Sequence, residues 1–169
     1  RQQVTFHTCS GPLPVQKRGD RYEMDFPAYT LSPVPVTEAM AAAFGARPTA
    51  AYLGRDLLCV FDREETVQGL TPDQAALRGL EGLLQHATAR GRAADCVSRS
   101  FAPKCGVPED PVCGSGHCHI FPYWARVLGK DTLVAWQASP RGGTLYGTLE
   151  GDRVKLAGKA VIFAATTFF

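Results

Sequence analysis

The feature that most constrains the fold is the segment from Gly114 to Leu128, which has the length of a helix but almost no polar face. Two glycines and a serine open the segment, and apolar and aromatic side chains fill its second half. Gly129 follows, where a helix-ending glycine is typical. A helix that is apolar nearly all round must be buried nearly all round. The sequence therefore predicts a central helix that the rest of the chain surrounds.

Short strands joined by turns account for most of the remaining sequence. Glycine and proline make up 17 and 12 of the 169 residues, a density that favours many short elements over a helical bundle. Further helices are predicted at 37–44 and 71–89, and a loop at 103–111. We expect an α+β fold in which a curled sheet wraps the central helix. Residue alternation predicts strands at 4–9, 13–17, 21–26, 49–53, 56–61, 94–101, 132–137, 143–149, 153–157 and 160–169.

Composition argues against several classes of function. The formal net charge is only +2, and the sequence has no basic run or stripe, so we expect no nucleic-acid partner. Its longest apolar run near the end falls far short of the roughly 20 residues of a membrane span, so we expect no membrane partner. Six cysteines in a chain without a secretory apolar segment favour reduced thiols and a cytoplasmic protein over disulfide bonds.

The segment from Pro108 to His119 is the candidate chemical site. Its glycines let a ligand approach the backbone, and the free amides of a first helical turn carry partial positive charge. A carboxylate or phosphate would suit this position, with Ser115 as an added hydroxyl donor. Asp110 stands just before the helix, where a carboxylate either exchanges protons with a ligand or simply stabilises the helix start.

Cysteine and histidine residues of this segment raise the question of a metal site. Cys113 is either a thiolate with a lowered pKa at the helix start or a small buried residue. Cys113 and His117 lie four residues apart, and Cys105, Cys118 and His119 are close in sequence. The chain has no C-x-x-C pair, and the spacing fits no zinc template, so we predict no metal.

A tight turn, Arg141-Gly142-Gly143, follows the strand predicted at 132–137. One interpretation is a plain hairpin turn with an exposed arginine. The other is that Arg141 reaches a carboxylate bound at the start of the central helix. The residues by themselves do not decide between the two.

Three stretches together resemble the PhzF-like family, which is named for phenazine biosynthesis and is related to the diaminopimelate epimerases. They are MDFPA at 24–28, the long stretch at 98–130, and SPRGG at 139–143. Their order and spacing fit that family. The resemblance implies a diaminopimelate epimerase-like fold of two similar lobes. Each lobe is a barrel-like curled sheet, mixed or antiparallel, around a central helix, and the active site lies in the cleft between the lobes.

The resemblance also implies how the chain is divided. Residues 19–158 correspond to the second lobe, with its central helix at 114–128. Residues 1–18 resemble the last strands of the first lobe, and 159–169 are expected to form a terminal strand.

Site residues follow from the same resemblance. Asp110 matches the acidic residue of the motif E-D-P-V-x-G-S, which is thought to assist proton transfer. Cys113 falls where epimerases of the wider fold carry one of two catalytic cysteines, and His117 matches the motif histidine. Both are kept as further candidates. The residues expected to bind substrate are Gly114, Ser115, Gly116, Arg141 and Gly142.

The function implied is that of an isomerase or epimerase that works without a cofactor on a small carboxylate metabolite. The family's principal catalytic glutamate and a Gly-His motif belong to the first lobe and have no match in this sequence, so these residues supply one side of a site. The alternative is a non-catalytic half-protein that pairs through its cleft face and edge strands. The expected partners are a small carboxylate and either a second copy, forming a homodimer, or a first lobe.

Overall fold

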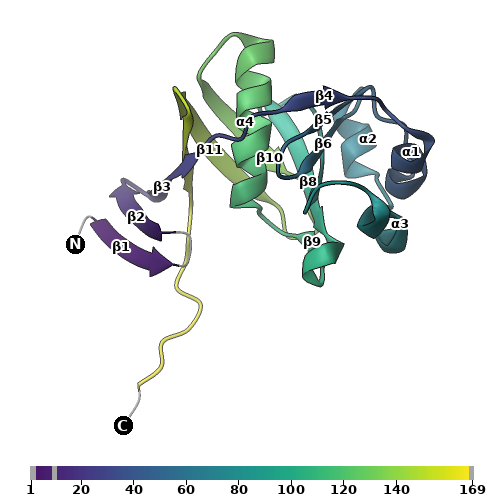
Figure 1. Cartoon of the computed structure of the whole chain (residues 1–169). Helices are drawn as coiled ribbons and strands as arrows, with labels where there is room; N and C mark the ends of the chain where they lie inside the picture. Colours follow the sequence, from purple (N-terminus) through teal and green to yellow (C-terminus); the bar gives the residue numbers. More distant parts are fainter. Residues whose placement is uncertain (1–2, 9–10, 168–169) are drawn as a thin grey trace.

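The computed structural model of the chain describes residues 3–8 and 11–167 (Figure 1). Within them the helices are α1 (Glu38–Phe44), α2 (Glu64–Gln68), α3 (Gln74–Gly79) and α4 (Gly114–Leu128), with a short 3-10 helix at Pro103–Cys105. The strands are β1 (Gln3–Thr8), β2 (Gly11–Arg18), β3 (Arg21–Pro27), β4 (Ser32–Val34), β5 (Ala50–Leu53), β6 (Leu57–Val60), β7 (Gln85–Arg90), β8 (Cys96–Ala102), β9 (Val107–Asp110), β10 (Thr132–Gln137), β11 (Gly143–Glu150) and β12 (Arg153–Gly158).

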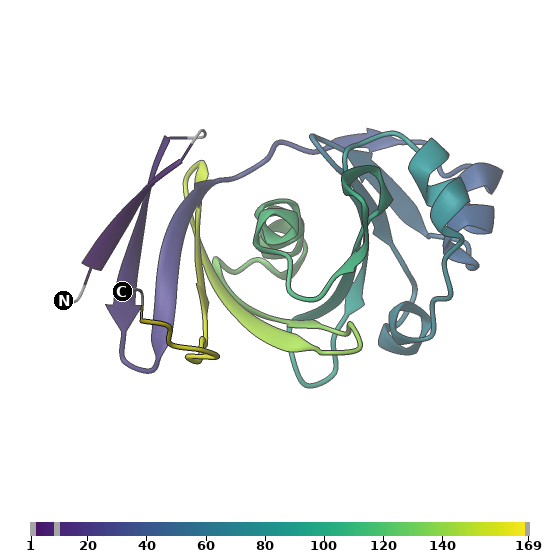
Figure 2. The ribbon, with the colours of Figure 1, turned by 90° about the horizontal axis from the view of Figure 1, so that it is seen from below.

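All of these strands belong to one mixed sheet with the order β1-β2-β3-β12-β11-β10-β8-β7-β6-β5-β4, and β9 pairs with β8 beside this path. Most neighbours are antiparallel, whereas β6 runs parallel to β7 and β8 runs parallel to β10. Figure 2 looks along α4 and shows the sheet curling around it. The α+β fold expected from the sequence is confirmed, with a curled sheet that stays open between β1 and β4 across the described residues.

Helix α4 has the predicted bounds and lies in the hollow of the sheet. Ile120 and Phe121 are fully buried, and the ring nitrogen of Trp124 donates a hydrogen bond of 2.9 Å to Thr88 Oγ1 on β7. Apolar residues of β8 and β10–β12 complete this core. The nearly apolar surface of this helix is therefore matched by a sheet that covers most of it.

A second core lies on the other face of β5–β8, where α1, α2 and α3 pack (Figure 1). Strand β6 serves both cores. Leu57 and Cys59 face the three short helices, whereas Leu58 and Val60 face the core of α4. The alternation of a strand sends successive side chains to opposite faces, so a strand between two layers is apolar at every position.

The helix predicted at 71–89 is wrong over most of its length. Helix α3 ends at Gly79, and Gln85–Arg90 form the buried strand β7. Gly82 adopts a φ of 78° and lies so close to Leu57 that a Cβ atom would come within 2.5 Å of its nitrogen. The leucines that suggested one helix face do not share an environment, because Leu77, Leu80 and Leu84 are buried whereas Leu83 is 44% exposed. The chain turns after α3, and β7 then pairs with both β6 and β8.

Other predictions differ at the periphery. The loop expected at 103–111 contains the 3-10 helix and β9, and the sequence pattern did not indicate β4 or α2. Of the terminal strand expected at 160–169, residues 160–167 form no strand, and the last two lie outside the described residues. Cys9, at the end of the strand predicted at 4–9, also lies outside them. None of the helices described has the length and hydropathy needed to cross a membrane.

Candidate functional site

The candidate site is the junction between β9 and α4. Asp110 is the last residue of β9, and its Oδ1 accepts a hydrogen bond of 3.0 Å from the Val112 amide, which turns the chain toward the helix. Cys113 is the N-cap, and its sulfur accepts a hydrogen bond of 3.3 Å from the Gly116 amide. Gly114 then begins the helix, as the sequence predicted.

The end of β10 brings the turn at 139–142 to this junction. Ser139 Oγ donates a hydrogen bond of 2.7 Å to the Pro111 carbonyl and accepts one of 3.0 Å from the Gly142 amide. Gln137 bonds to the same junction through both ends of its side-chain amide. Two stretches that lie well apart in sequence therefore form one surface.

A groove with a volume of about 860 Å³ runs past this surface. Gly114, Arg141 and Gly142 line it, so three of the five residues expected to bind substrate face one cavity. The exposed Arg141 side chain has no ion-pair partner within the described residues, whereas Lys159, the other cation of the lining, is paired with Asp20 at 2.8 Å. The groove thus offers a cation to an anionic ligand.

The remaining predicted residues lie beside or behind the groove. Asp110 and Ser115 are half-buried and border the helix start without lining the cavity. Gly116 is buried, and a Cβ atom there would come within 2.7 Å of the His86 ring. Its amide is bonded to Cys113, so Gly116 serves the close packing of the helix start and does not face the cavity.

Cys113 is 1% exposed, and its properties are those of a thiol. Burial raises the pKa of the Cys113 thiol, and the contact with the Ser115 hydroxyl offsets only part of this rise. The charge of Asp110 raises the pKa further. Of the two interpretations open from the sequence, the structure favours the small buried residue, with an added role as the helix N-cap.

His117 is fully buried and points toward β8. Its Nδ1 lies 2.6 Å from the Cys113 carbonyl, which can only accept, so Nδ1 donates. Its Nε2 lies 3.2 Å from Ser98 Oγ and accepts the hydroxyl proton. Burial lowers the pKa of His117 to about 4, so the ring is neutral at pH 7 and anchors the helix start to the sheet.

The burial of neutral His117 predicts a loss of stability in acid. The folded pKa of about 4 lies below the unfolded value of about 6.5, so the contribution is complete above pH 6.5 and is lost as the pH falls toward 4. We expect His117 to lower the free energy of unfolding by about 2 kcal/mol between pH 7 and pH 4.5. Urea unfolding at both pH values measures this loss. In His117→Asn the loss should shrink by that amount, and an unchanged loss would contradict the prediction.

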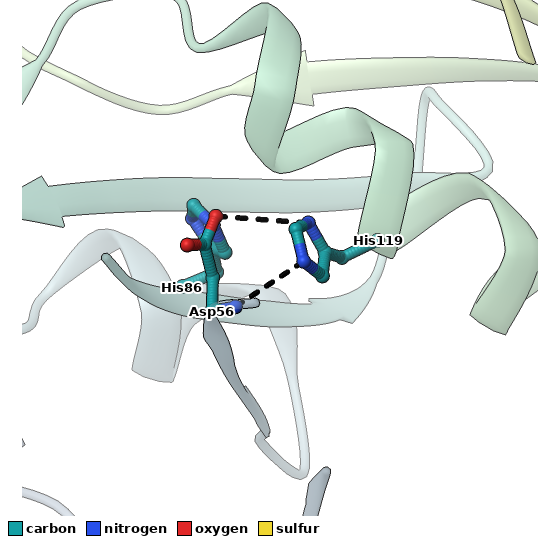
Figure 3. Close-up of side chains that lie close together, drawn as sticks. All are labelled: Asp56, His86 and His119. Carbon is teal, nitrogen blue, oxygen red and sulfur yellow. Dashed lines mark hydrogen bonds and ion pairs between the residues drawn. The ribbon is translucent and has the colours of Figure 1, made fainter. Parts of the chain in front are cut away.

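A second buried polar cluster lies behind α4 and consists of Asp56, His86 and His119, all fully buried (Figure 3). His86 Nε2 lies 3.0 Å from Asp56 Oδ2, and the other ring nitrogen lies 2.9 Å from Ser100 Oγ. The Asp56 amide donates to His119 Nε2 at 3.3 Å, so this ring is protonated at Nδ1 and faces the Ser115 carbonyl at 3.1 Å.

Charge within this cluster is balanced by Arg55. Burial alone raises the pKa of the Asp56 carboxyl group, but hydrogen bonds from His86 and Arg55 reverse this effect and hold it well below its usual range. Burial lowers the pKa of His119 to about 4, so this ring is neutral at pH 7. The cluster therefore ties the start of β6, the strand β7 and helix α4 together through an ionised aspartate.

Asp56, His86 and His119 also resemble a metal-binding set, because two imidazoles and a carboxylate have donor atoms that all lie within 4.8 Å of one another. However, the Asp56 carboxylate already accepts hydrogen bonds from both Nε and Nη2 of Arg55, from the Leu84 amide and from His86. A metal ion would have to displace the guanidinium group. In the arrangement described, the residues form a satisfied ion-pair network.

Glu109, beside Asp110, is committed to a structural contact. Its carboxylate accepts two hydrogen bonds of 2.8 Å from Arg99 Nε and Nη2 on β8, and both side chains are mostly buried. Arg99 also donates to the Leu70 carbonyl at 2.6 Å. This bidentate pair holds β9 against β8, and it leaves Asp110 as the acidic residue next to the helix start.

The fold and the site define an α+β lobe in which a sheet curls around one helix and presents the start of that helix to a groove. A family model described as phenazine biosynthesis-like protein, PhzC-PhzF, matches residues 1–166, and the chain belongs to this family. The resemblance inferred from the sequence is therefore confirmed.

Similar proteins agree with this assignment. The chain is 44% identical over 165 residues to an uncharacterized isomerase of Pseudomonas aeruginosa and covers 63% of its length. A PhzF family crystal structure from Enterococcus faecalis is 44% identical with a TM-score of 0.94, over 97% of this chain and 64% of that one. A putative PhzC/PhzF protein from Clostridium difficile is 38% identical with a TM-score of 0.92, over 100% and 66%. The chain thus spans less than two thirds of the length of the first relatives it matches.

Sequence reasoning missed the residues that hold this site together. Gln137 is the last residue of a predicted strand, and Ser139 follows two positions along. This spacing was the available signal that both side chains point the same way. Asp56 and His86 gave no signal, because each stands alone in its own segment and their contact spans 30 residues.

Proposed function

We propose that this chain supplies one side of the active site of a cofactor-independent isomerase that moves a proton on a small carboxylate metabolite. The observation that carries the proposal is the groove in which the start of α4 and the unpaired Arg141 meet beside Asp110. Relatives named as isomerases support the reaction class. The substrate and the rest of the site are part of the proposal.

The geometry suggests a division of labour between these groups. The substrate carboxylate would lie at the first turn of α4, where backbone amides and the helix dipole favour an anion, and Arg141 would add a cation. Asp110 would take a proton from one carbon atom of the substrate, or return one to another carbon atom. Removal of the proton leaves the electron pair of the C–H bond on the substrate, and the returned proton uses that pair to form a new C–H bond. The new bond forms at another carbon atom in an isomerase, or at the same carbon atom from the opposite face in an epimerase, so the reaction needs no external oxidant or reductant.

Deuterium uptake tests this proposal even though the substrate is unidentified. The protein, as its natural gene encodes it, is incubated in D2O with a metabolite extract from its own cells. We expect a carboxylic acid in the extract to gain one deuterium on carbon, as measured by mass spectrometry, and heat-denatured protein to give no gain. If no acid gains deuterium in a protein-dependent way, the proposed function is overturned.

A second candidate, self-association through the cleft face and edge strands, is favoured by exposed apolar side chains. Val4 and Phe6 are about half exposed on β1, which ends the sheet. Val161, which lines the groove, and the following Ile162 and Phe163 are more than nine-tenths exposed. We propose that a second copy of the chain covers these side chains, forming a homodimer. Sedimentation over a wide concentration range should then show a dimer, and a monomer at every concentration would exclude it.

A cytoplasmic location is also proposed. The five cysteines that the structure describes are all unpaired, which suits a reducing compartment, and Cys9 lies outside the described residues. Labelling of intact thiols directly after cell lysis would test this, because oxidised cysteines would point to another compartment.

A further inference from the structure

Gln137 is a fully buried polar residue. Its side chain contacts the junction between β9 and α4 on both sides of the bend in the chain. Its Oε1 accepts a hydrogen bond of 2.7 Å from the Cys113 amide, and its Nε2 donates one of 2.5 Å to the Asp110 carbonyl. One planar amide group therefore spans the segment from the proposed proton-transfer residue to the helix N-cap. Both of its polar ends are satisfied by backbone atoms of that segment.

The backbone of Gln137 is itself held on both sides. Its strand β10 pairs with β11, where Gln137 lies opposite Gly143, and with β8, where it lies opposite Ser98. A side chain with several rotatable bonds can hold other groups in place only if its own conformation is fixed. Burial and the paired strand β10 fix the conformation of Gln137. Ser139, two positions along, bonds to the Pro111 carbonyl inside the same segment.

We propose that Gln137 is a positioning residue that fixes Asp110 relative to the first turn of α4. The proposal rests on the proposed function in one respect, because it takes Asp110 as the group that moves the proton. The physical reason is that proton transfer and anion binding need both groups in one geometry, and a misplacement of about 1 Å can cost roughly 10²-fold in rate. The Gln137 amide sets that geometry before a substrate arrives.

The change Gln137→Glu tests this role through pH. A protonated carboxyl group keeps one donor and one acceptor and so retains both contacts. An ionised carboxylate has only acceptors and faces the Asp110 carbonyl oxygen, so the contact to Asp110 is lost. Burial, and a hydrogen bond from the protonated carboxyl group to the Asp110 carbonyl oxygen, favour the neutral form of the introduced group and move its pKa upward.

Two readouts follow from this change. In the wild type, the amide chemical shifts of Gly114, Ser115 and Gly116 should be similar at pH 5.5 and pH 8. In Gln137→Glu they should match the wild type at pH 5.5 and depart from it at pH 8. The rate of deuterium transfer should be lower than in the wild type by about 100-fold at pH 8 and should recover at pH 5.5.

Gln85→Glu is the matched control. Gln85 is also fully buried, lies on β7, and donates from Nε2 to the carbonyls of Glu81 and Gly82, away from the groove. It tests the cost of a buried carboxyl group without touching the site, so the shifts of 114–116 and the deuterium rate should equal those of the wild type at both pH 5.5 and pH 8. If the two variants behave alike, the positioning role is overturned.

The shift measurement separates this proposal from the proposed function. If the wild type transfers no deuterium, the proposed function fails, but a pH-dependent shift at 114–116 in Gln137→Glu still supports the positioning of the helix start. If Gln137→Glu does not fold, Gln137→Met carries the test, because methionine has a similar length and removes both polar contacts of Gln137, to Asp110 and to Cys113. Altered amide shifts at Val112 and Gly114 would then support the role, and unchanged shifts would overturn it.

Discussion

Asp110→Asn is expected to lower the rate of deuterium transfer by about 10²–10⁴-fold, because an amide cannot accept and return a proton as a carboxylate does. The fold should be retained. Asp110 Oδ1 accepts its hydrogen bond from the Val112 amide, and the asparagine oxygen can accept the same bond. The free energy of unfolding should therefore change by less than about 0.5 kcal/mol, so a lost rate reports on chemistry.

Asp73→Asn is the control for this experiment. Asp73 also stands at a helix start, where its Oδ1 accepts hydrogen bonds from the amides of Ala75 and Ala76 at the beginning of α3. It lies outside the groove lining. The same substitution there should leave the rate of deuterium transfer unchanged. Wild-type rates in Asp110→Asn, or equal losses in both variants, would contradict a proton-transfer role for Asp110.

The elements that could be predicted from the sequence are those whose signals are local. Helix α4 was predicted with its observed bounds, because its glycines and its apolar surface lie within one continuous segment. The turns at Arg18–Arg21 and Glu150–Arg153 have short glycine-containing loops, and the strands on either side pair as expected. At these places the hydrophobic pattern of the strands and the turn-forming residues predict the same structure, so the prediction from local sequence is correct.

The prediction of a helix at 71–89 was wrong because contacts with distant residues determine the structure of this segment. A stripe of leucines has the same spacing whether it covers a helix face or fills a bend between two cores. Gly82 permits that bend because it lies against the backbone of Leu57, which belongs to a strand far earlier in the sequence. Strand β7 is buried on both faces, so it lacks the alternation that identifies a half-buried strand.

In the candidate site, too, some features have a local sequence signal and others depend on contacts with distant residues. The segment from Asp110 to Ser115 was singled out from its own residues, whereas the contact from Gln137 to Asp110 spans 27 residues. Likewise, His117 is neutral and structural only because the fold surrounds it with Ser98 and the Cys113 carbonyl. Whether a polar residue serves chemistry or architecture depends on burial and on distant partners, which a single sequence does not display.

Gly147→Ala is expected to lower the free energy of unfolding by about 3 kcal/mol. Gly147 lies in β11 beneath α4, and a Cβ atom there would come within 2.2 Å of the Phe121 ring. Phe121 is only 1% exposed and packs in the core of α4. The added methyl group must therefore push the helix away from the sheet or force the ring out of its rotamer. Urea unfolding measures the loss.

Gly158→Ala provides the matched comparison, because Gly158 ends the neighbouring strand β12 and its added Cβ atom would meet only the Thr144 carbonyl, at 3.9 Å. Its effect on the free energy of unfolding should stay within about 1 kcal/mol.

Phe121→Leu should partly relieve the effect of Gly147→Ala. The double variant should therefore lose at least about 1 kcal/mol less than the sum of the losses in the two single variants. Additive losses, or equal losses at the two glycines, would show that Gly147 is not what allows α4 to lie close to the sheet. Non-additive losses would show that the close contact between Gly147 and Phe121 keeps α4 against the sheet, and so helps to hold the helix start at the groove.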